Sequence, residues 1–364
     1  MKTLILPILF VPLFFQNLTA QSEARKCASD EYFLNMLSKN PGLQQRWEEA
    51  YKKLSQGQGV NQDDNDRMGG MVPNPTPYDS LMPEKISVPV VFHIIAPSED
   101  HPANIDRAQI LSQLNELNRA FGQEDYSNTS LFPSIWTNRY PIGTGIRFCL
   151  ARRDPKGNPT RGITRRFNGI ASYTYQNGQA DDAMKYSIAG GQDAWPIEDY
   201  LNIWVVVLDE YTEALGWATY PIDGYEPGTY GIVLGYENFG PGGTATAPYD
   251  LGRTLVHEVG HFLGLMHTWG MFINDCMYDD LIDDTPLQAS PNFYCNMSVS
   301  ANGSLSPPWT TTCDGERDML QNFMNASEDA CNTFFTRGQV SQMKSELRAG
   351  GYWYSLFLST TACK

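Results

Sequence analysis

The sequence predicts an α+β domain preceded by a helical N-terminal segment. Short apolar runs of strand length recur from residue 86 onward, and segments with helical spacing of apolar residues lie between them. A stretch rich in Gly, Asn, Asp and Pro, residues 57–78, separates the two parts. With 41% hydrophobic and 12% aromatic residues among 364, the chain is able to bury a sizeable core.

The expected strands and helices follow one another along the main domain. The expected strands are 86–95, 146–151, 201–208 and 230–234, and the expected helices are 110–121, 250–263 and 339–348. Segment 201–208 is apolar on both faces, so we expect it at the centre of a sheet. After residue 263 the chain has few periodic segments before the last helix, so this part is expected to be irregular.

The first 20 residues are typical of a secretory signal peptide. Lys2 provides a positive charge, and the apolar run 4–15 contains two prolines and is too short to span a bilayer. A small residue, Ala20, ends the segment, and we expect cleavage after it. A secreted protein without a membrane span follows from this reading, and an uncleaved anchor is the alternative.

Residues 21–75 are expected to form a propeptide and linker, ahead of a catalytic domain at 76–364. Segments 31–39 and 43–54 carry apolar residues at helical spacing, and the linker then follows. An ordinary N-terminal extension is the alternative reading. The formal net charge of −15 argues against nucleic acid as a partner, because no basic patch stands out to attract phosphates.

The seven cysteines leave one thiol unpaired if the others form disulfides in an oxidising compartment. Cys27, which is far from the rest, is the candidate for the free thiol, although parity also allows it to pair with Cys363. Cys149 is expected either to pair with Cys363 or to remain a buried free thiol. The other four cysteines are evenly spaced, and spacing alone allows three pairings: Cys276, Cys295, Cys313 and Cys331.

Three of the five histidines lie in one eleven-residue stretch, HEVGHFLGLMH at 257–267. Residues four apart share a helix face, so His257 and His261 are expected to point the same way. Gly264 can adopt a left-handed conformation and end the helix, which lets His267 turn back as a third ligand. Three protein ligands leave the fourth tetrahedral position of a zinc ion for water, as in catalytic zinc sites.

Glu258 directly follows the first histidine and is expected to act as the general base, not as a ligand. Zinc lowers the pKa of bound water to about 7 and polarises a scissile carbonyl, while the carboxylate takes the water's proton and passes one to the leaving amine. The pattern therefore predicts a zinc-dependent endopeptidase. A buried histidine-rich helix, the alternative, would leave three imidazoles without evident partners.

Beyond this motif, the chain resembles the metzincin metallopeptidases and, within them, the pappalysin family, over about residues 80–345. The resemblance is carried by the following segments: VPVVFHII (88–95), FCLARRDPKGNPTRGI (148–163), LGWATYP (215–221), GRTLVHEVGHFLGLMHTWG (252–270), DDLIDDTPLQ (279–288), QNFMNASEDAC (321–331) and FFTRGQVSQM (334–343). It implies two subdomains. The upper one has a twisted mixed sheet and the zinc helix, and the lower one is irregular and stapled by disulfides.

The resemblance also assigns roles to single residues. Met324 matches the methionine of the Met-turn, which lies beneath the zinc site; an ordinary core methionine is the alternative. Family members usually have a tyrosine two residues later, and Ala326 replaces it here. The implied disulfides are Cys276–Cys313 and Cys295–Cys331. Cys27 lies in KCASDEYFLNMLSKNP and matches the cysteine that caps the zinc ion of the latent zymogen.

A calcium site is implied at Asp280, Asp283 and Thr285, where hard oxygen ligands are dense. A solvated acidic loop is the alternative. Segment 215–221 matches the edge strand that binds protein or peptide substrates as an extended strand. Family members that cut beside Arg or Lys carry an acidic residue at the position of Asn332, so we predict no strong basic preference for this substrate pocket. We also expect a monomer.

Two competing functions remain open at this point. The first is a zinc-binding homologue that is weak or inactive in catalysis and serves as a binding or adhesion module, which Ala326 favours and the intact Glu258 opposes. The second is a calcium-stabilised structural domain with incidental histidines.

Overall fold

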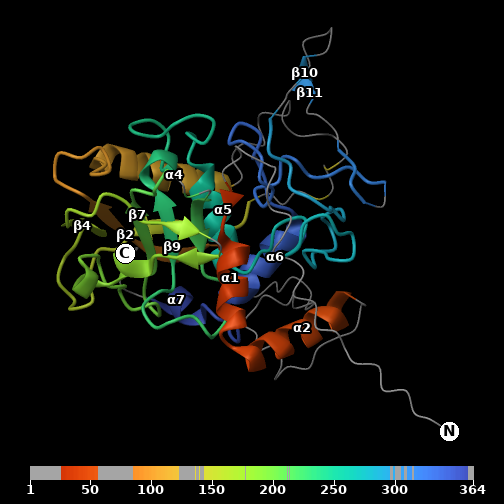
Figure 1. Ribbon diagram of the computed structural model, residues 1–364, viewed down its shortest axis with the longest axis horizontal. Helices are drawn as coiled ribbons and strands as arrows, with labels where there is room; N and C mark the ends of the chain where they lie inside the picture. The colour runs from red at the N-terminus through yellow and green to blue at the C-terminus, as the bar shows by residue number, and fades with distance from the viewer. Residues whose placement is uncertain are drawn as a thin grey trace.

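The computed structural model describes residues 26–55, 85–122, 136, 139, 143–176, 178–210, 212, 214–295, 298–299, 305–306, 310–313 and 315–359 (Figure 1). The expected signal peptide, most of the expected linker and Cys363 lie outside these residues. Among the described residues, no helix combines the length and the apolar character needed to cross a membrane.

A seven-stranded mixed sheet forms the centre of the main domain. Its strand order is β1-β8-β9-β7-β2-β3, with β4 also paired to β2. All neighbours are parallel except β8 and β9, which are antiparallel. The strands are β1 (Lys26–Cys27), β2 (Ile86–Ala96), β3 (Ile146–Leu150), β4 (Ile163–Phe167), β7 (Leu201–Val206), β8 (Ala214–Ala218) and β9 (Ile232–Gly235).

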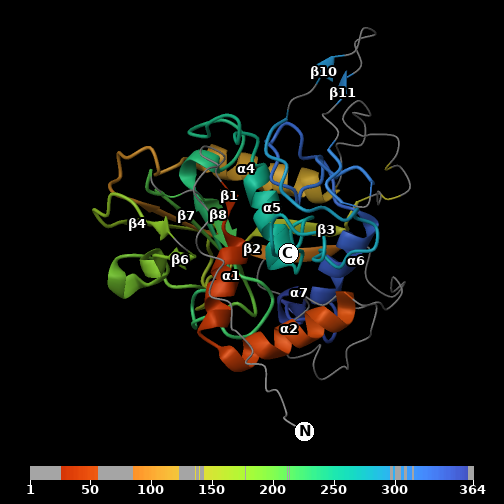
Figure 2. The same ribbon diagram turned by 45° about the vertical axis from the view of Figure 1, so that its right-hand side comes forward.

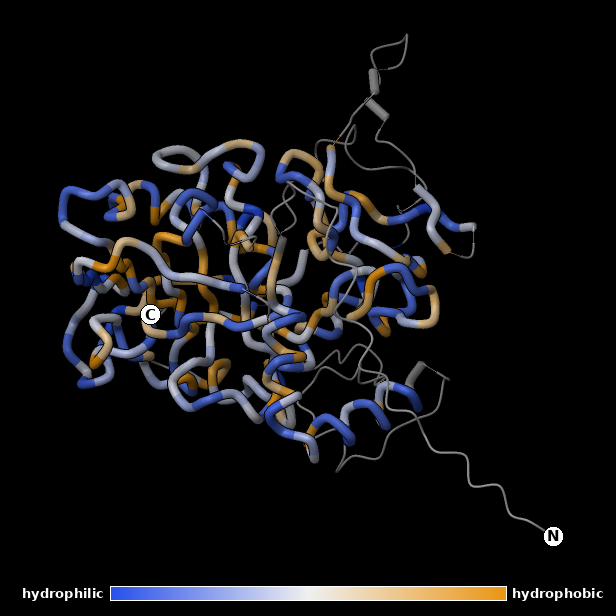
Figure 3. Tube along the Cα trace, viewed as in Figure 1, coloured by the Kyte–Doolittle hydropathy of each residue, from blue (hydrophilic) through white to orange (hydrophobic). Residues whose placement is uncertain are grey.

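The central strands of the sheet are almost entirely buried, and most of their side chains are apolar. All six residues of β7 are buried, and this strand lies between β9 and β2, which confirms its expected central place. Figure 3 shows the central strands mostly in orange and the outer loops mostly in blue. Two-residue strands form separate hairpins: β5 (Tyr175–Gln176) with β6 (Gln179–Ala180), and β10 (Ser298–Val299) with β11 (Leu305–Ser306).

Two helices pack against each other and against this sheet. They are α4 (Arg107–Gly122), which contacts β3, and α5 (Arg253–Phe262), which contacts β8 and β9. Later in the chain come α6 (Arg337–Glu346) and α7 (Tyr354–Leu358), and α7 contacts β2. Short 3-10 helices lie at Asp182–Lys185, Ser187–Ala189 and Tyr236–Asn238.

The expected elements are present, with shifted ends that have local causes. The helix expected at 250–263 begins at Arg253, because Gly252 before it has a left-handed φ of 76°. The helix expected at 339–348 begins at Arg337, where Thr336 accepts a hydrogen bond from the Gln339 backbone in a capping box. Strand β4 was not expected, because its sequence ITRRF is largely polar.

The N-terminal segment packs on the main domain. Its helices are α1 (Ser29–Ser38) and α2 (Pro41–Ser55), so Pro41 opens the second helix instead of lying in a break between them. Strand β1 joins the sheet beside β8. Helix α1 then lies next to β8 and α5 in both views (Figures 1 and 2). Residues 26–55 therefore belong to the same packed body as the sheet.

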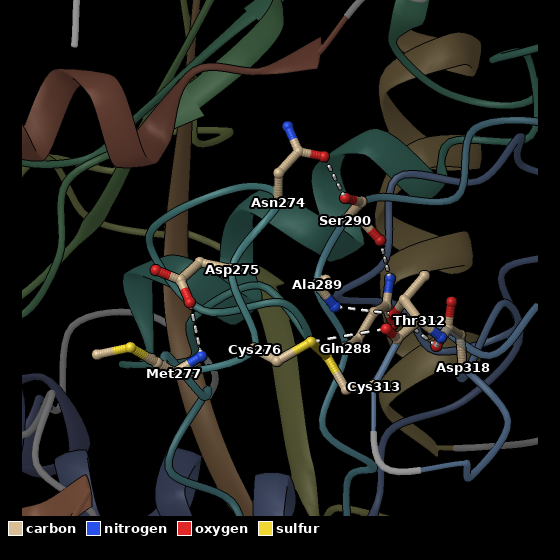
Figure 4. Close-up of a disulfide and its surroundings, with 10 residues drawn as sticks. All are labelled: Asn274, Asp275, Cys276, Met277, Gln288, Ala289, Ser290, Thr312, Cys313 and Asp318. Atoms are coloured by element: carbon tan, nitrogen blue, oxygen red, sulfur yellow. Dashed lines mark hydrogen bonds between the residues drawn. A yellow bond between two sulfur atoms is a disulfide. The ribbon is translucent and has the colours of Figure 1, made fainter. Parts of the chain in front are cut away.

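Disulfides hold the irregular part after α5. Cys276 bonds to Cys313 and Cys295 to Cys331, which are the pairs that the resemblance implies. Figure 4 shows the first disulfide beside a polar network, in which Thr312 accepts a hydrogen bond from the Ala289 backbone and contacts Asp318. Cys149 is also disulfide-bonded, so the reading of it as a free thiol is wrong.

Candidate metal centre and active site

The histidine motif folds as a helix followed by a sharp turn. His257 and His261 lie on α5, which is anchored in the core by the buried residues Leu255, Val259 and Phe262. Gly264 has a φ of 86°, and its N–H bonds to the carbonyl of His261 at 2.9 Å, so the helix ends there. The chain then turns back and brings His267 to the same point.

The three imidazoles meet through their Nε2 atoms. These atoms are 3.0 Å apart for His257 and His261, 3.1 Å for His257 and His267, and 3.2 Å for His261 and His267. Zinc–nitrogen bonds of about 2.0–2.1 Å in a tetrahedron imply nitrogen separations of about 3.3 Å. The cluster therefore fits one zinc-sized ion.

Hydrogen bonds on the opposite ring nitrogen fix each imidazole. The Nδ1 of His257 donates to the carbonyl of Phe323 at 2.6 Å, and that of His261 donates to the carbonyl of Leu265 at 2.7 Å. Since a carbonyl can only accept, Nδ1 carries the proton and the Nε2 lone pair points inward, as metal ligation needs. Burial, followed by the nearby His267, lowers the pKa of His257 to about 3, so its ring is neutral.

Glu258 lies beside this cluster and is fully buried. Burial raises the pKa of its carboxyl group to about 7, which is suited to accepting and returning a proton near neutral pH. Oε2 accepts a hydrogen bond from Ser29 Oγ at 2.8 Å, whereas Oε1 has no partner among the described residues.

Cys27 of β1 points into the same site from the N-terminal segment. Its Sγ and the ligand nitrogens of the three histidines all lie within 4.8 Å of one another, and it is a free thiol, so the alternative pairing with Cys363 is wrong. Burial and the adjacent Glu258 raise the pKa of this thiol. A bound cation would act in the opposite direction and favour the thiolate.

Two residues that follow Cys27 also contact the site, although sequence reasoning missed them. Ser29 bonds to Glu258, and its Oγ also accepts from the backbone N–H of Ala218 in β8 at 2.8 Å. Asp30 accepts from His267 Nδ1 at 2.5 Å and from the Tyr220 hydroxyl at 2.6 Å. The only sequence signal was their nearness to Cys27, because their partners lie about 190 residues or more away in the chain.

Met324 lies directly beneath the helix that carries the histidines. It is completely buried, and a Cβ atom added at Gly260 of α5 would lie 2.4 Å from its Sδ. The preceding residue, Phe323, supplies the carbonyl that orients His257. Met324 thus packs against the helix that carries the histidines, Gly260 is what allows this close approach, and the Met-turn role of Met324 stays a prediction.

A pocket opens beside the metal cluster. It is lined by residues of β1, β8, α5, the loop before α5 and the segment after Met324: Cys27, Leu215, Tyr249, Arg253, Thr254, His257, Glu258, Asn325, Ala326, Ser327, Asp329 and Asn332. The amide of Asn332 bonds to Ser327, because it donates to the carbonyl at 2.8 Å and accepts from Oγ at 2.9 Å. Asp329, which sequence reasoning also missed, accepts from the backbone N–H of Leu251 at 2.8 Å.

The residues expected to bind calcium are only partly brought together. Asp280 Oδ1 accepts from the Thr285 hydroxyl at 2.7 Å, and its buried Oδ2 has no partner among the described residues. Asp283 is exposed. Among the described residues, only the cluster of Cys27 and the three histidines has ligand atoms that converge as at a metal site, so calcium remains a prediction.

Comparisons with known proteins agree with this geometry. A family model described as pregnancy-associated plasma protein-A, Peptidase M43, matches residues 185–348. An extracellular metalloprotease of Arthroderma benhamiae is 30% identical over 284 residues, 75% of this chain and 77% of the relative. Extracellular metalloprotease 1 of Coccidioides posadasii is 31% identical over 274 residues, 73% of this chain and 79% of the relative.

Two solved structures from Tannerella forsythia are also similar. Mature mirolysin in complex with a cleaved peptide is 37% identical, with a TM-score of 0.65, and the match covers 75% of this chain and 95% of that one. A promirolysin mutant is 32% identical with a TM-score of 0.71, covering 92% and 97%. With its metzincin-type sheet, helix and histidine cluster, the chain belongs to the pappalysin family and is an extracellular metalloendopeptidase.

Proposed function

We propose that the chain is the zymogen of a zinc endopeptidase in which His257, His261 and His267 hold the ion and Glu258 is the general base. The observation that carries this proposal is the convergence of three Nε2 atoms within 3.0–3.2 Å, beside a buried carboxylate. A bound zinc ion would supply Lewis acidity toward the scissile carbonyl and toward water.

The chain's own residues hold the ligands and move the proton. The carbonyls of Phe323 and Leu265 keep two imidazoles in the ligating tautomer. The Glu258 carboxylate takes a proton from the attacking water and delivers one to the leaving amine. Its raised pKa, about 7, supports both halves of this exchange.

Latency is proposed to come from the N-terminal segment, with 1–20 as signal peptide, 21–75 as propeptide and linker, and 76–364 as catalytic domain. Cys27 would occupy the ligand position that a water molecule takes in the processed enzyme. The promirolysin structure supports this division, because it matches 92% of this chain whereas mature mirolysin matches 75%.

Protein or peptide substrates are proposed to bind as an extended strand along β8. In the zymogen β1 is paired with this strand, and the N–H of Ala28 bonds to the carbonyl of Gly216 at 3.0 Å. Departure of β1 would free these backbone groups for a substrate strand. The bound peptide in mature mirolysin supports this mode. The neutral Asn332 in the adjoining pocket still favours no strong basic preference, and we expect a monomer.

The decisive experiment replaces Glu258 with Gln in the processed enzyme. Casein cleavage should fall by about 10²–10⁴-fold, the usual contribution of a general base, while zinc stays stoichiometric by elemental analysis. Wild-type cleavage should be blocked by a zinc chelator. Full turnover in Glu258→Gln would refute the assigned base, and zinc-loaded wild type without any cleavage would instead favour the binding-module alternative.

A further inference from the structure

The carboxylate of Asp30 occupies a small polar cradle behind the metal cluster. Its Oδ1 accepts from the Tyr220 hydroxyl at 2.6 Å, and its Oδ2 accepts from His267 Nδ1 at 2.5 Å. All three residues are buried, with exposed fractions of 9% for Asp30, 0% for Tyr220 and 3% for His267. The cradle therefore presents two donors to one carboxylate, away from bulk water.

The walls of the cradle come partly from the catalytic domain and partly from α1, whose Phe33 packs edge-on against Tyr220 with centroids 5.2 Å apart. The Trp269 ring stacks on the His267 ring, with centroids 4.2 Å apart and planes 9° apart. Tyr220 packs edge-on against His261 at 5.2 Å. The Trp269 ring and the 3.0 Å contact of the Tyr220 hydroxyl with His261 Nδ1 hold the two donors from the catalytic-domain side. We therefore expect both to keep their positions when the N-terminal segment leaves, and each then lacks the Asp30 oxygen to which it donates in the zymogen.

The chemistry of the two donors selects a carboxylate. His267 directs Nε2 into the metal cluster, so Nδ1 carries the proton and can only donate. A tyrosine hydroxyl, with an ordinary pKa of about 10, is a donor at neutral pH. Two converging donors match the two oxygens of an ionised carboxyl group, which makes stronger hydrogen bonds than a neutral amide does. Glu258 lies nearby, and a bound cation would offset the charge of its ionised form.

We propose that in the processed enzyme this cradle is a subsite for a carboxylate of the substrate, supplied by an Asp or Glu side chain near the scissile bond. The proposal rests on the proposed peptidase function and adds a substrate preference to it. The cradle and the metal position lie on opposite sides of the His267 ring, so only one imidazole separates them. An extended peptide advances about 3.3 Å per residue, so we expect the acidic residue within about two residues of the cleaved bond.

The test compares acidic and amide side chains in otherwise identical peptides. One fluorogenic peptide that the processed enzyme cleaves is remade with Asp or Asn at each of the three positions on either side of the cleaved bond. Wild type should prefer Asp at one position by roughly tenfold in kcat/KM, mostly through KM, as expected for one hydrogen bond to a charged group. In Tyr220→Phe the Asp-to-Asn ratio should fall close to one.

Tyr225→Phe is the matched control. Tyr225 lies in the same segment, where its hydroxyl accepts from the Tyr220 backbone N–H at 3.2 Å without contacting the carboxylate, so this variant should keep the wild-type ratio. Equal rates for Asp and Asn at every position, or an unchanged ratio in Tyr220→Phe, would overturn the subsite. Failure of zinc-loaded wild type to cleave any peptide would overturn the peptidase function itself, and the subsite with it.

A binding measurement covers the case in which Tyr220→Phe does not fold. A peptide of residues 26–38 and its Asp30→Asn version are titrated calorimetrically into processed Glu258→Gln enzyme. The Asp30 peptide should bind roughly tenfold more tightly. Equal affinities would overturn the proposal without reference to catalysis.

Discussion

Three side chains close together in the chain each contact a different part of the reactive site. Cys27 approaches the three histidines, Ser29 bonds to the general base, and Asp30 holds the third histidine and Tyr220. Since these contacts are separate, no single one is expected to account for all of the latency. In the proposed zymogen the cysteine would block the metal position, whereas the serine and the aspartate anchor the start of α1 beside it.

Replacing these side chains should therefore release latency in steps. We expect Cys27→Ala to give detectable premature activity in the unprocessed protein, and Cys27→Ala combined with Ser29→Ala and Asp30→Asn to give clearly more. The measurement is hydrolysis of a peptide by intact zymogen, with gels to confirm that no processing has occurred. Ser38→Ala, at the exposed end of α1, is the control and should remain latent. If Cys27→Ala is as silent as wild type, the thiol is not the metal cap.

The metal ligands could be predicted from the sequence because they are local, whereas the rest of the site could not. His257, His261 and His267 lie within eleven residues, and helix periodicity with one glycine is enough to bring them together. Asp30 is separated from His267 by 237 positions, so their contact depends on how the whole chain folds. An isolated Ser-Asp pair has no pattern that distinguishes it from an ordinary helix start.

At the scale of elements, the turn after α5 decides whether the third ligand arrives. Gly264→Ala would place a Cβ at a φ of 86°, a conformation that costs about 1–2 kcal/mol for other residues, and would move His267. We expect weaker zinc binding, measured by competition with a chromogenic chelator. Gly157→Ala, at a φ of 80° in an open turn, should carry the backbone cost alone and keep the wild-type affinity. Equal zinc affinity in both variants would contradict this role for Gly264.

Strand β2 carries a buried histidine that should make the fold sensitive to acid. His93 bonds to Asn202 Oδ1 at 2.9 Å and Thr164 Oγ1 at 2.8 Å, and burial lowers its pKa from 6.5 to about 4. Because the pKa of His93 is lower in the folded state than in the unfolded state, its contribution to the free energy of unfolding is fully present above pH 6.5. This contribution is lost as the pH drops toward 4. The loss by pH 4 should be about 3 kcal/mol.

Urea unfolding at several pH values checks this expectation. His93→Gln should lose less free energy of unfolding between pH 7 and 4 than wild type, whatever its stability at pH 7. His101→Gln, in a partly exposed loop, is the control and should follow wild type. Comparison with wild type is needed because Asp329, whose pKa burial raises to about 6, stabilises the fold as the pH falls. Parallel curves for wild type and His93→Gln would exclude His93 as the source.

Element positions were more predictable than their arrangement. The long apolar segment of β2 and the fully buried β7 stand out in the sequence, as does the helical spacing of α4. The order of strands does not, because parallel pairing depends on contacts between distant segments. The antiparallel pairing of β8 with β9, which places the proposed substrate-binding edge, is likewise a property of the folded sheet.

At the scale of the whole molecule, the loop with the predicted calcium ligands contacts helix α2 of the N-terminal segment. The Tyr51 hydroxyl of α2 donates to the carbonyl of Asp279 at 2.6 Å and accepts from the backbone N–H of Asp279 at 2.8 Å. Two hydrogen bonds therefore hold the proposed propeptide against this loop. The buried Oδ2 of the neighbouring Asp280, which has no partner in the part of the chain that the structure describes, is available to a cation there.

Calcium binding at this loop should raise the melting temperature. We expect the midpoint of the zinc-loaded protein to rise by several degrees when millimolar calcium replaces a calcium-selective chelator, because a ligand that binds only the folded state stabilises it. Magnesium at the same concentration is the control and should have little effect, and Asp280→Asn should remove the response. An unchanged midpoint with calcium would discard the site.

The pairing of β1 with β8 has a further consequence for the tendency of the protein to aggregate. Without β1, the buried strand β8 would present a row of open backbone groups at the margin of the sheet, and such margins recruit other chains into aggregates. The N-terminal segment would thus cover the exposed edge of the sheet during export. Catalytic domains expressed without this segment should precipitate more readily than the full precursor.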